Sequence, residues 1–311
     1  MTGRFAPSPS GRMHLGNVYS ALISWLSAKS QDGAWILRIE DLDPQRCRRE
    51  YAVQLEDDLR WLGLTWDAGG IGQPDYVQSQ RGDIYAEHLE RLRAIGLTYP
   101  CYCSRADILA TQAPHESDGR VVYRGTCRPD GTVEKTEWLA NRAASCPHAP
   151  AIRLRVPDRE IRFTDGHYGE QAVNLAHECG DFILRRADGA WAYQLAVVVD
   201  DALMGVTEVV RGRDLLLSVP QQLYLYEVLG YSAPRFAHLP LLCNEVGQRL
   251  CKRDKSLDMG VLRQQFSAEE IIGHIAHIAG LTDREEKVSA NDLLPHFRWD
   301  AIPREDVRIE N

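Results

Sequence analysis

The sequence contains no apolar run long enough to span a membrane, and its N-terminus lacks the charged and then apolar pattern of a signal peptide. We therefore expect a cytoplasmic protein with no membrane partner. Internal repeats and low-complexity segments are also absent, so neither a solenoid nor a compositionally disordered chain is expected.

The chain has no excess of positive charge, because 36 Lys and Arg residues stand against 44 Asp and Glu residues, for a net charge of −8. This balance provides no general attraction to nucleic acid, although a local basic face on an acidic protein can still bind RNA. The eight cysteines of a cytosolic chain are not expected to form disulfides, so each is a candidate for metal ligation or packing. With 311 residues, 44% of them hydrophobic, the chain accommodates one large α/β domain with smaller additions.

The first seventeen residues predict a strand, a turn and the start of a helix. A short strand over 3–6 ends at the turn 7–11, whose two prolines lack the N–H groups that a strand ladder requires. Apolar residues then recur at helical spacing over 18–26. His14 and Gly16 consequently lie at the N-terminus of a helix, where free backbone N–H groups and the helix dipole favour a phosphate.

The N-terminal hundred residues alternate between strands and helices. Strand patterns occupy 34–39 and 97–102, and helix patterns occupy 48–62 and 80–95. This rhythm predicts an α/β fold with a doubly wound parallel sheet, whose ligands bind at the carboxyl ends of the strands.

The rhythm breaks after residue 100. Residues 101–190 are rich in Cys, His, Pro, Gly and Arg and have no clear periodicity, so we interpret them as an insertion. Regular structure is expected to resume with a buried strand at 191–199, a strand at 207–211 and a helix at 215–229, and a further helix is expected at 268–278. The expected segments are the first half of a Rossmann-type domain at 1–100, the insertion at 101–190, the second half at 191–245, and a loop with a short helical region at 246–311.

A basic loop follows the last strand of the expected core and contains Arg249, Lys252 and Arg253. Cations on a loop that closes over a triphosphate neutralise the charge that develops as pyrophosphate departs. A short basic run is by itself weak evidence, since most such runs are solvated surface. The basic run becomes stronger evidence because the expected helix start at His14 and Gly16 also favours a phosphate in the same fold.

Together these segments resemble the class I aminoacyl-tRNA synthetases, in particular the glutamyl and glutaminyl branch. Four motifs carry the resemblance, namely the HIGH-like region at 4–17, a strand motif at 38–43, an amino-acid-binding segment at 200–212 and a KMSKS-like loop at 249–253. The resemblance covers nearly the whole chain and implies a class I synthetase catalytic domain. Arg249 and Cys251 depart from the loop motif, whereas Lys252 is retained.

Only about sixty residues follow this loop, so we expect no anticodon-binding domain of the kind that glutamyl-tRNA synthetases carry. In this short C-terminal part and in the segments 8–11 and 193–201, the chain resembles the glutamyl-Q tRNA(Asp) synthetases. That family activates L-glutamate with ATP and attaches it to the queuosine base at the wobble position of tRNA(Asp). The resemblance therefore implies ATP with Mg²⁺, and tRNA(Asp) carrying queuosine, as substrates, and we expect a monomer.

Glutamate presents two carboxylates and an ammonium group, which need different partners. Arg4 and Arg211 lie at the carboxyl-side ends of two expected strands, and guanidinium groups suit bidentate carboxylate recognition. By resemblance, these arginines and Tyr193 hold the side-chain carboxylate, Glu40 holds the ammonium group, and Ser8 holds the backbone end of the amino acid. The remaining residues of the expected glutamate site are Phe5, Ala6 and Pro7.

Adenylate formation needs no covalent enzyme intermediate, because the glutamate carboxylate attacks the ATP α-phosphorus directly. Catalysis is then positioning and charge stabilisation. The resemblance assigns the charge stabilisation to His14 and Lys252, and the ATP site to these two residues with Gly16 and Asn17. In the second step a hydroxyl of the queuosine cyclopentenediol attacks the adenylate.

Cys101, Cys103 and Cys127 form a second constellation, in which two close thiols and a distant one are typical of a structural zinc site. On spacing alone the fourth ligand stays open between Tyr123, His115, and the pair Cys146 and His148. The pattern Cys-x-Cys…Tyr-x-x-x-Cys of the family that the chain resembles implies Tyr123. We expect one structural Zn²⁺.

Two other functions remain open. One is a minimal glutamyl-tRNA synthetase that acts on the 3′ end of tRNA and depends on a partner for anticodon recognition. The other is a paralogue without catalytic activity that binds glutamate, adenylate or RNA, an option that the altered Arg249 and Cys251 keep open. Retention of His14 and Lys252 argues against the second alternative.

Overall fold

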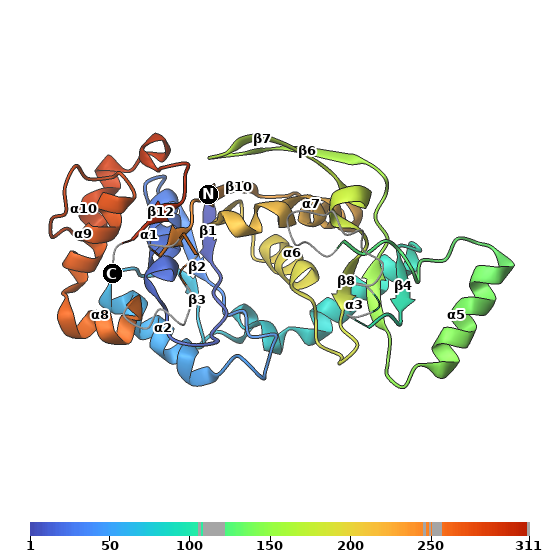
Figure 1. Cartoon of the computed structure of the whole chain (residues 1–311). Coiled ribbons are helices and arrows are strands. Elements are labelled where there is room, and N and C mark those ends of the chain that lie inside the picture. Colours follow the sequence, from blue (N-terminus) through green and yellow to red (C-terminus); the bar gives the residue numbers. More distant parts are fainter. Residues whose placement is uncertain (105–106, 108–121, 245–246, 249, 251–256, 310–311) are drawn as a thin grey trace.

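The computed structural model describes residues 1–104, 107, 122–244, 247–248, 250 and 257–309. At its centre is a fully parallel five-stranded sheet with the strand order β10-β9-β1-β2-β3 (Figure 1). Its strands are β1 (Thr2–Phe5), β2 (Ala34–Leu37), β3 (Ala68–Gly69), β9 (Glu208–Gly212) and β10 (Arg235–Leu239). The predicted parallel sheet is thus confirmed.

Both faces of this sheet are buried under helices. Trp35 and Leu37 on β2 belong to one hydrophobic core, whereas Ile36 between them belongs to another, because successive strand residues point to opposite faces. The first core includes α1 (Leu15–Lys29) and α2 (Arg49–Trp61). The second core includes α3 (Gly82–Ala94), α6 (Tyr193–Leu203) and α7 (Val219–Leu229). This is the doubly wound arrangement.

A separate antiparallel sheet lies beside the parallel one. It consists of β4 (Thr98–Cys101), β5 (Ala151–Leu154) and β8 (Phe182–Arg185), in the order β4-β5-β8. The strand expected at 97–102 is therefore present, but it does not join the parallel sheet. Alternation along the sequence gives the order of the elements, whereas the pairing partner of each strand is fixed by tertiary contacts.

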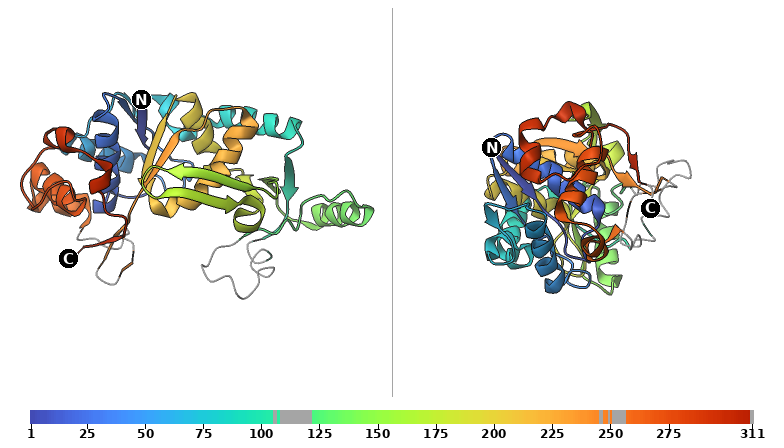
Figure 2. Two further views of the ribbon diagram at one scale, coloured as in Figure 1. Left: turned by 90° about the horizontal axis from the view of Figure 1, so that it is seen from above. Right: turned by 90° about the vertical axis from the view of Figure 1, so that its left-hand side faces the viewer.

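The segment 101–190 contains more regular structure than its lack of periodicity indicates. It includes helix α5 (Val133–Ser145), a hairpin of β6 (Glu160–Asp165) and β7 (Gly169–Asn174), and a π-helical turn over Leu175–Cys179. Figures 1 and 2 show α5 projecting at the end of the molecule opposite to the C-terminal helices, and the hairpin running back beside β10. Helix α5 has no buried residue, so its sequence has no need of the apolar stripe that marks a packed helix.

The buried strand expected at 191–199 is wrong, because this run forms most of α6. Every residue from Leu195 to Asp201 is buried. A helix that is surrounded by other elements needs no polar face, so its sequence becomes a continuous apolar run. Periodicity does not distinguish such a run from a strand buried on both faces.

The helix expected at 215–229 begins later than predicted. A 3₁₀ turn occupies Arg213–Ser218, and α7 starts at Val219 with Pro220 in its first turn. Proline is well tolerated there, because the first N–H groups of a helix have no partner within the helix. The sequence pattern merged the 3₁₀ turn and the helix into one element.

The C-terminal region is helical, as expected. It contains α8 (Met259–Gln265), α9 (Ala268–Ile278) and α10 (Ala290–Leu293), and a two-stranded sheet of β11 (Leu242–Cys243) and β12 (Val307–Arg308). Helix α9 has the predicted bounds, and a capping box between Ser267 and Glu270 fixes its start. In the described part of the chain, no helix combines the length and the apolar content needed to cross a membrane.

Candidate active site and metal centre

A cavity of about 440 Å³ lies at the carboxyl ends of β1 and β9, beside the N-terminus of α1. The chain leaves β1 toward β2 on one side, while β9 adjoins β1 on the other, and ligands of open α/β sheets bind at such a switch point. Apart from Lys252, every substrate residue predicted from the sequence lines this cavity. These residues are Arg4, Phe5, Ala6, Pro7, Ser8, His14, Gly16, Asn17, Glu40, Tyr193 and Arg211.

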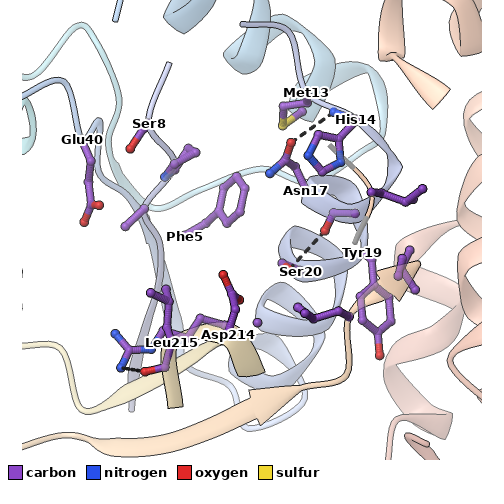
Figure 3. A pocket seen from close by; sticks show the side chains of 18 of the residues that line it. Phe5, Ser8, Met13, His14, Asn17, Tyr19, Ser20, Glu40, Asp214 and Leu215 are labelled. Atoms are coloured by element: carbon purple, nitrogen blue, oxygen red, sulfur yellow. Dashed lines mark hydrogen bonds between the residues drawn. The ribbon is translucent and has the colours of Figure 1, made fainter. Parts of the chain in front are cut away.

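The start of α1 forms one wall of the cavity, as Figure 3 shows, with Phe5, Ser8 and Glu40 across from it. His14 is the N-cap residue with extended backbone geometry, and its N–H donates to Asn17 Oδ1 over 3.1 Å. A Cβ on Gly16 would lie 3.1 Å from His14 Cε1, so glycine leaves space for the imidazole. This wall offers backbone N–H groups and the positive end of the helix dipole to an anion.

The basic loop cannot be placed against the cavity directly, because Arg249, Cys251 and Lys252 lie outside the described residues. Its described neighbours do reach the site. Leu250 lines the cavity, and the Met259 N–H donates to the Met13 carbonyl oxygen over 2.9 Å.

Arg4 and Glu40 are held by a buried charge network beneath the cavity. Arg38, which is fully buried, donates to Asp201 Oδ1 over 2.6 Å and to Glu40 Oε1 over 3.0 Å. Arg4 Nε donates to the same Asp201 oxygen over 3.4 Å. The network therefore fixes one cationic and one anionic side chain at the cavity wall.

The network extends through Asp200 on α6. Asp200 accepts hydrogen bonds from Arg81 Nε at 2.7 Å, Gln78 Nε2 at 2.8 Å and the Tyr85 hydroxyl at 2.9 Å. Arg38 Nε lies 3.8 Å from Asp200 Oδ2. Three arginines thus balance three carboxylates, and buried charges require such compensation.

Burial and neighbouring charge move the pKa values of the two carboxyl groups beside Arg38 in opposite directions. Burial raises the pKa of Glu40, and the attraction of Arg38 and Arg4 only partly offsets it. Burial acts in the same direction on Asp201, but the adjacent Arg38 and Arg4 lower its pKa overall. Asp201 is therefore ionised more readily than Glu40 within the network.

Arg211 is held differently from Arg4. Its guanidinium donates to His238 Nε2 at 3.1 Å, Gln222 Oε1 at 2.9 Å and the Tyr193 hydroxyl at 3.2 Å. It also donates to the Leu215 carbonyl oxygen at 3.2 Å. Burial lowers the pKa of Arg211, which marks a poorly solvated cation.

The three predicted metal-site cysteines come together in the structure. The Sγ atoms of Cys101, Cys103 and Cys127 all lie within 4.8 Å of one another. The Tyr123 hydroxyl lies 3.4 Å from Cys101 Sγ and 3.8 Å from Cys103 Sγ, and it accepts the Cys127 N–H over 2.6 Å. Hydrogen bonds from Cys127 and Tyr123 lower the pKa of Cys101 against the opposing effect of burial. Three sulfurs and one oxygen are a donor set that fits Zn²⁺.

Of the other candidates for the fourth ligand, the pair Cys146 and His148 stands apart from this group. Cys146 and His148 contact each other at 3.4 Å, but neither belongs to the metal-ligating group found among the described residues. His115 lies outside the described residues. Of the candidates open to comparison, Tyr123 is the one that the fold brings to the cysteines.

The sequence matches the family model of the class I tRNA synthetases (E and Q), catalytic domain, over residues 1–297. This chain belongs to that family. The match includes the parallel sheet, the cavity at its switch point and the cysteine group, so the fold and the candidate sites all lie within the family's catalytic domain.

Within the family, the chain is similar to proteins named glutamyl-Q tRNA(Asp) synthetase. It is 48% identical to the one from Symbiobacterium thermophilum, over 99% of this chain and 96% of that protein. It is 43% identical to the one from Neisseria meningitidis serogroup C, over 98% of each chain.

Solved family structures have the same fold. A glutamate tRNA ligase from Elizabethkingia meningosepticum, in complex with its amino acid, matches with a TM-score of 0.80 and 30% identity. The glutamate-tRNA synthetase from Elizabethkingia anophelis matches with a TM-score of 0.81 and 30% identity. The match covers 99% of this chain but only 66% and 68% of those longer chains.

Sequence reasoning missed the residues that hold Arg211. His238 and Gln222 belong to no recognisable motif. Asp165, which contacts His238, lies in the segment without periodicity. The one available signal is His238 itself, a polar residue within the otherwise apolar end of β10. Asp201 and Arg38 lie in recognised motifs, but only the structure reveals their contacts with Arg4 and Glu40.

Proposed function

We propose that this protein activates L-glutamate with ATP and transfers the glutamyl group to the queuosine base at the wobble position of tRNA(Asp). The observation that carries the proposal is the similarity, at 43–48% identity over nearly the full length of both chains, to proteins named glutamyl-Q tRNA(Asp) synthetase. The cavity at the switch point supports it, because its charged groups complement those of glutamate.

In this proposal Arg4, Arg211 and Tyr193 bind the side-chain carboxylate of glutamate, Glu40 binds the ammonium group and Ser8 binds the backbone end. The two guanidinium groups come from neighbouring strands, which supports their convergence on one carboxylate. Glu40 lies across the cavity from the start of α1. A glutamate whose ammonium group binds Glu40 would therefore have its α-carboxylate directed toward the helix start, where the phosphates of ATP bind in this proposal.

In the first step an α-carboxylate oxygen attacks the α-phosphorus of ATP, and the bond to the bridging oxygen of pyrophosphate breaks. His14 and Lys252 stabilise the negative charge that builds up on the phosphates, and Gly16 and Asn17 complete the ATP site at the helix start. Mg²⁺ enters with ATP and neutralises part of the phosphate charge when bound.

In the second step a hydroxyl oxygen of the queuosine cyclopentenediol attacks the carbonyl carbon of the adenylate, and AMP leaves. A second cavity of about 420 Å³ adjoins the first and shares Ser8, Ser10, Glu40 and Tyr193 with it. We place the modified base there, because a base must leave the RNA stack to reach a reactive group in a pocket.

We further propose that Cys101, Cys103, Cys127 and Tyr123 hold one structural Zn²⁺. The ion would join β4 to the stretch around Tyr123 and Cys127, since the four donors come from both. Structural zinc adds folding free energy to small, loop-rich segments with little core of their own.

The experiment that tests the activation step is exchange of labelled pyrophosphate into ATP, with purified protein, glutamate and no RNA. The glutamyl-tRNA synthetases need tRNA for this step, whereas the glutamyl-Q family does not. We expect exchange with glutamate and none with glutamine, because the amide lacks the charge that two buried arginines require.

The second candidate is a glutamyl-tRNA synthetase that acts on the tRNA 3′ end, which the fold match to two such enzymes at 30% identity favours. Exchange that appears only after tRNA(Glu) is added would support it. Absence of exchange under both conditions would contradict both activities and favour a binding protein.

A further inference from the structure

A chain of buried hydrogen bonds ends on Arg211. The other two residues of this chain, His238 and Asp165, have no assigned contact with substrate. Arg211 Nε donates to His238 Nε2 over 3.1 Å, and His238 Nδ1 lies 2.6 Å from Asp165 Oδ2. Exposed fractions are 5% for Arg211, 0% for His238 and 1% for Asp165. These three side chains join β9, β10 and the end of β6.

The chemistry of this chain fixes the proton positions. Arginine has only donors, so His238 Nε2 must be the acceptor, and the imidazole proton therefore resides on Nδ1. Nδ1 then donates to the Asp165 carboxylate. Asp165 is itself fixed, because its Oδ1 accepts the backbone N–H groups of His167 at 3.0 Å, Tyr168 at 2.9 Å and His238 at 3.2 Å.

Electrostatics keep the imidazole neutral. Burial lowers the pKa of His238, and the nearby cations Arg211 and Arg4 lower it further, against the opposing effect of Asp165. The pKa of Asp165 stays below its ordinary value, since hydrogen bonds from His238 and the backbone outweigh the effect of burial.

Arg211 and Arg4 therefore differ in how their charge is compensated. Arg4 faces the carboxylate of Asp201 at 3.4 Å. The hydrogen bonds of Arg211 within the described residues all go to neutral acceptors, namely His238 Nε2, Gln222 Oε1, the Tyr193 hydroxyl and the Leu215 carbonyl. Asp201 attracts Arg211 through space without a hydrogen bond, so a carboxylate that enters the cavity would be the first to pair directly with this guanidinium.

We propose that Asp165 and His238 are positioning residues that aim Arg211 at the substrate and, by offering it only a neutral acceptor, set the preference for glutamate over glutamine. This inference rests on the proposed function, because it takes glutamate as the ligand of Arg211. A carboxylate in place of His238 would compensate the arginine and remove its demand for an anionic substrate.

The position of Asp165 gives the β6–β7 hairpin a role in the site. The hairpin docks on β10, where the Gly166 N–H donates to the Phe236 carbonyl oxygen over 2.8 Å. A Cβ on Gly166 would lie 3.2 Å from Ala237 Cβ, so the docking is tight. A residue from the segment 101–190 thus acts on the amino-acid pocket of the core.

Three variants separate positioning from general stability. In D165N the amide oxygen can still accept the backbone N–H groups, but its NH₂ would donate to His238 Nδ1 and force the proton onto Nε2, against Arg211. In H238N the shorter amide keeps a donor toward Asp165 but has no acceptor near the original Nε2. In H238Q the longer side chain places an amide oxygen near the original Nε2. Leaving a buried donor unpaired costs roughly 1–3 kcal/mol, which corresponds to about 5-fold to 150-fold in affinity.

The experiment is calorimetric binding of glutamate, glutamine and ATP to the wild type and the three variants. We expect the glutamate Kd to rise by about 5-fold to 150-fold in D165N and H238N, with ATP binding unchanged and the glutamate-to-glutamine preference reduced. H238Q should recover most of the affinity lost in H238N. A general loss of structure would weaken ATP binding as well.

The outcomes distinguish this inference from the proposed function. Equal glutamate affinity in wild type, D165N and H238N would overturn the inference, and so would H238Q binding as weakly as H238N. Wild-type protein that binds glutamate but never catalyses pyrophosphate exchange would contradict the proposed function alone. If D165N fails to fold, the comparison of H238N with H238Q still decides the question.

Discussion

Arg38 and Asp201 meet over 2.6 Å in the buried interior, although they lie 163 positions apart in the sequence. The contact joins the segment after β2 to α6, and both lie within the matched catalytic domain of the family. Because Arg38 also binds Glu40 and Asp201 also binds Arg4, this pair fixes two side chains of the cavity wall relative to α6.

Removing the Asp201 charge should destabilise the protein strongly. In D201N the buried guanidinium groups of Arg38 and Arg4 lose their shared anion, and breaking a buried pair in this way costs about 3–5 kcal/mol. Urea unfolding would measure the loss. The control is E90Q, which breaks the exposed pair of Glu90 with Arg93 and should cost less than about 1 kcal/mol. Equal losses in the two variants would contradict the role of the network.

His14 should matter for rate rather than for stability. Removal of a donor that stabilises developing charge lowers rates by about 100-fold to 1,000-fold, so H14A should slow pyrophosphate exchange to this extent. H148A is the matched control, because His148 is an exposed histidine outside the cavity. Exchange rates and thermal unfolding of both variants would be compared. An H14A rate within about threefold of the wild type would contradict the assignment.

How much of this site is readable from the sequence depends on the length of the motifs. Arg4, His14 and Gly16 lie within one short stretch whose strand, turn and helix are local features, and the structure places all three around one cavity. Cys101, Cys103 and Cys127 likewise have a spacing that indicates a shared site, and their sulfurs do meet.

The rest depends on contacts between distant segments. Asp165 and His238 are 73 residues apart, and neither belongs to a motif, so only the docking of the hairpin on β10 reveals the pair. The error at 191–199 has a related cause. Helix α6 is buried all round, which erases the periodicity that normally identifies a helix.

Stability should fall on mild acidification, in part because of His238. The folded-state pKa of His238 lies below its ordinary value of 6.5, so below about pH 6.5 the unfolded chain binds a proton that the folded chain excludes. Unfolding free energy then decreases with falling pH by up to about 1.4 kcal/mol per pH unit. H238Q lacks this contribution. Urea unfolding at pH 7, 6 and 5 should show a smaller decrease for H238Q, and equal decreases would contradict a buried neutral imidazole.

Metal analysis tests the cysteine group. Freshly purified, unchelated protein should contain about one zinc per chain, because three thiols and a tyrosine hydroxyl converge within bonding reach of one ion. C103S should lose the metal and unfold at a lower temperature. C179S is the control, since Cys179 does not belong to the group found among the described residues. Wild-type protein without zinc would contradict the assignment.

The most direct measurement is transfer of labelled glutamate to defined tRNAs. Purified protein, ATP and labelled glutamate would be incubated with tRNA(Asp) that carries queuosine, with the same tRNA from cells unable to make queuosine, and with tRNA(Glu). We predict label on the queuosine-containing tRNA(Asp) alone. Label on tRNA(Glu), or equal label on the two forms of tRNA(Asp), would contradict transfer to the modified base.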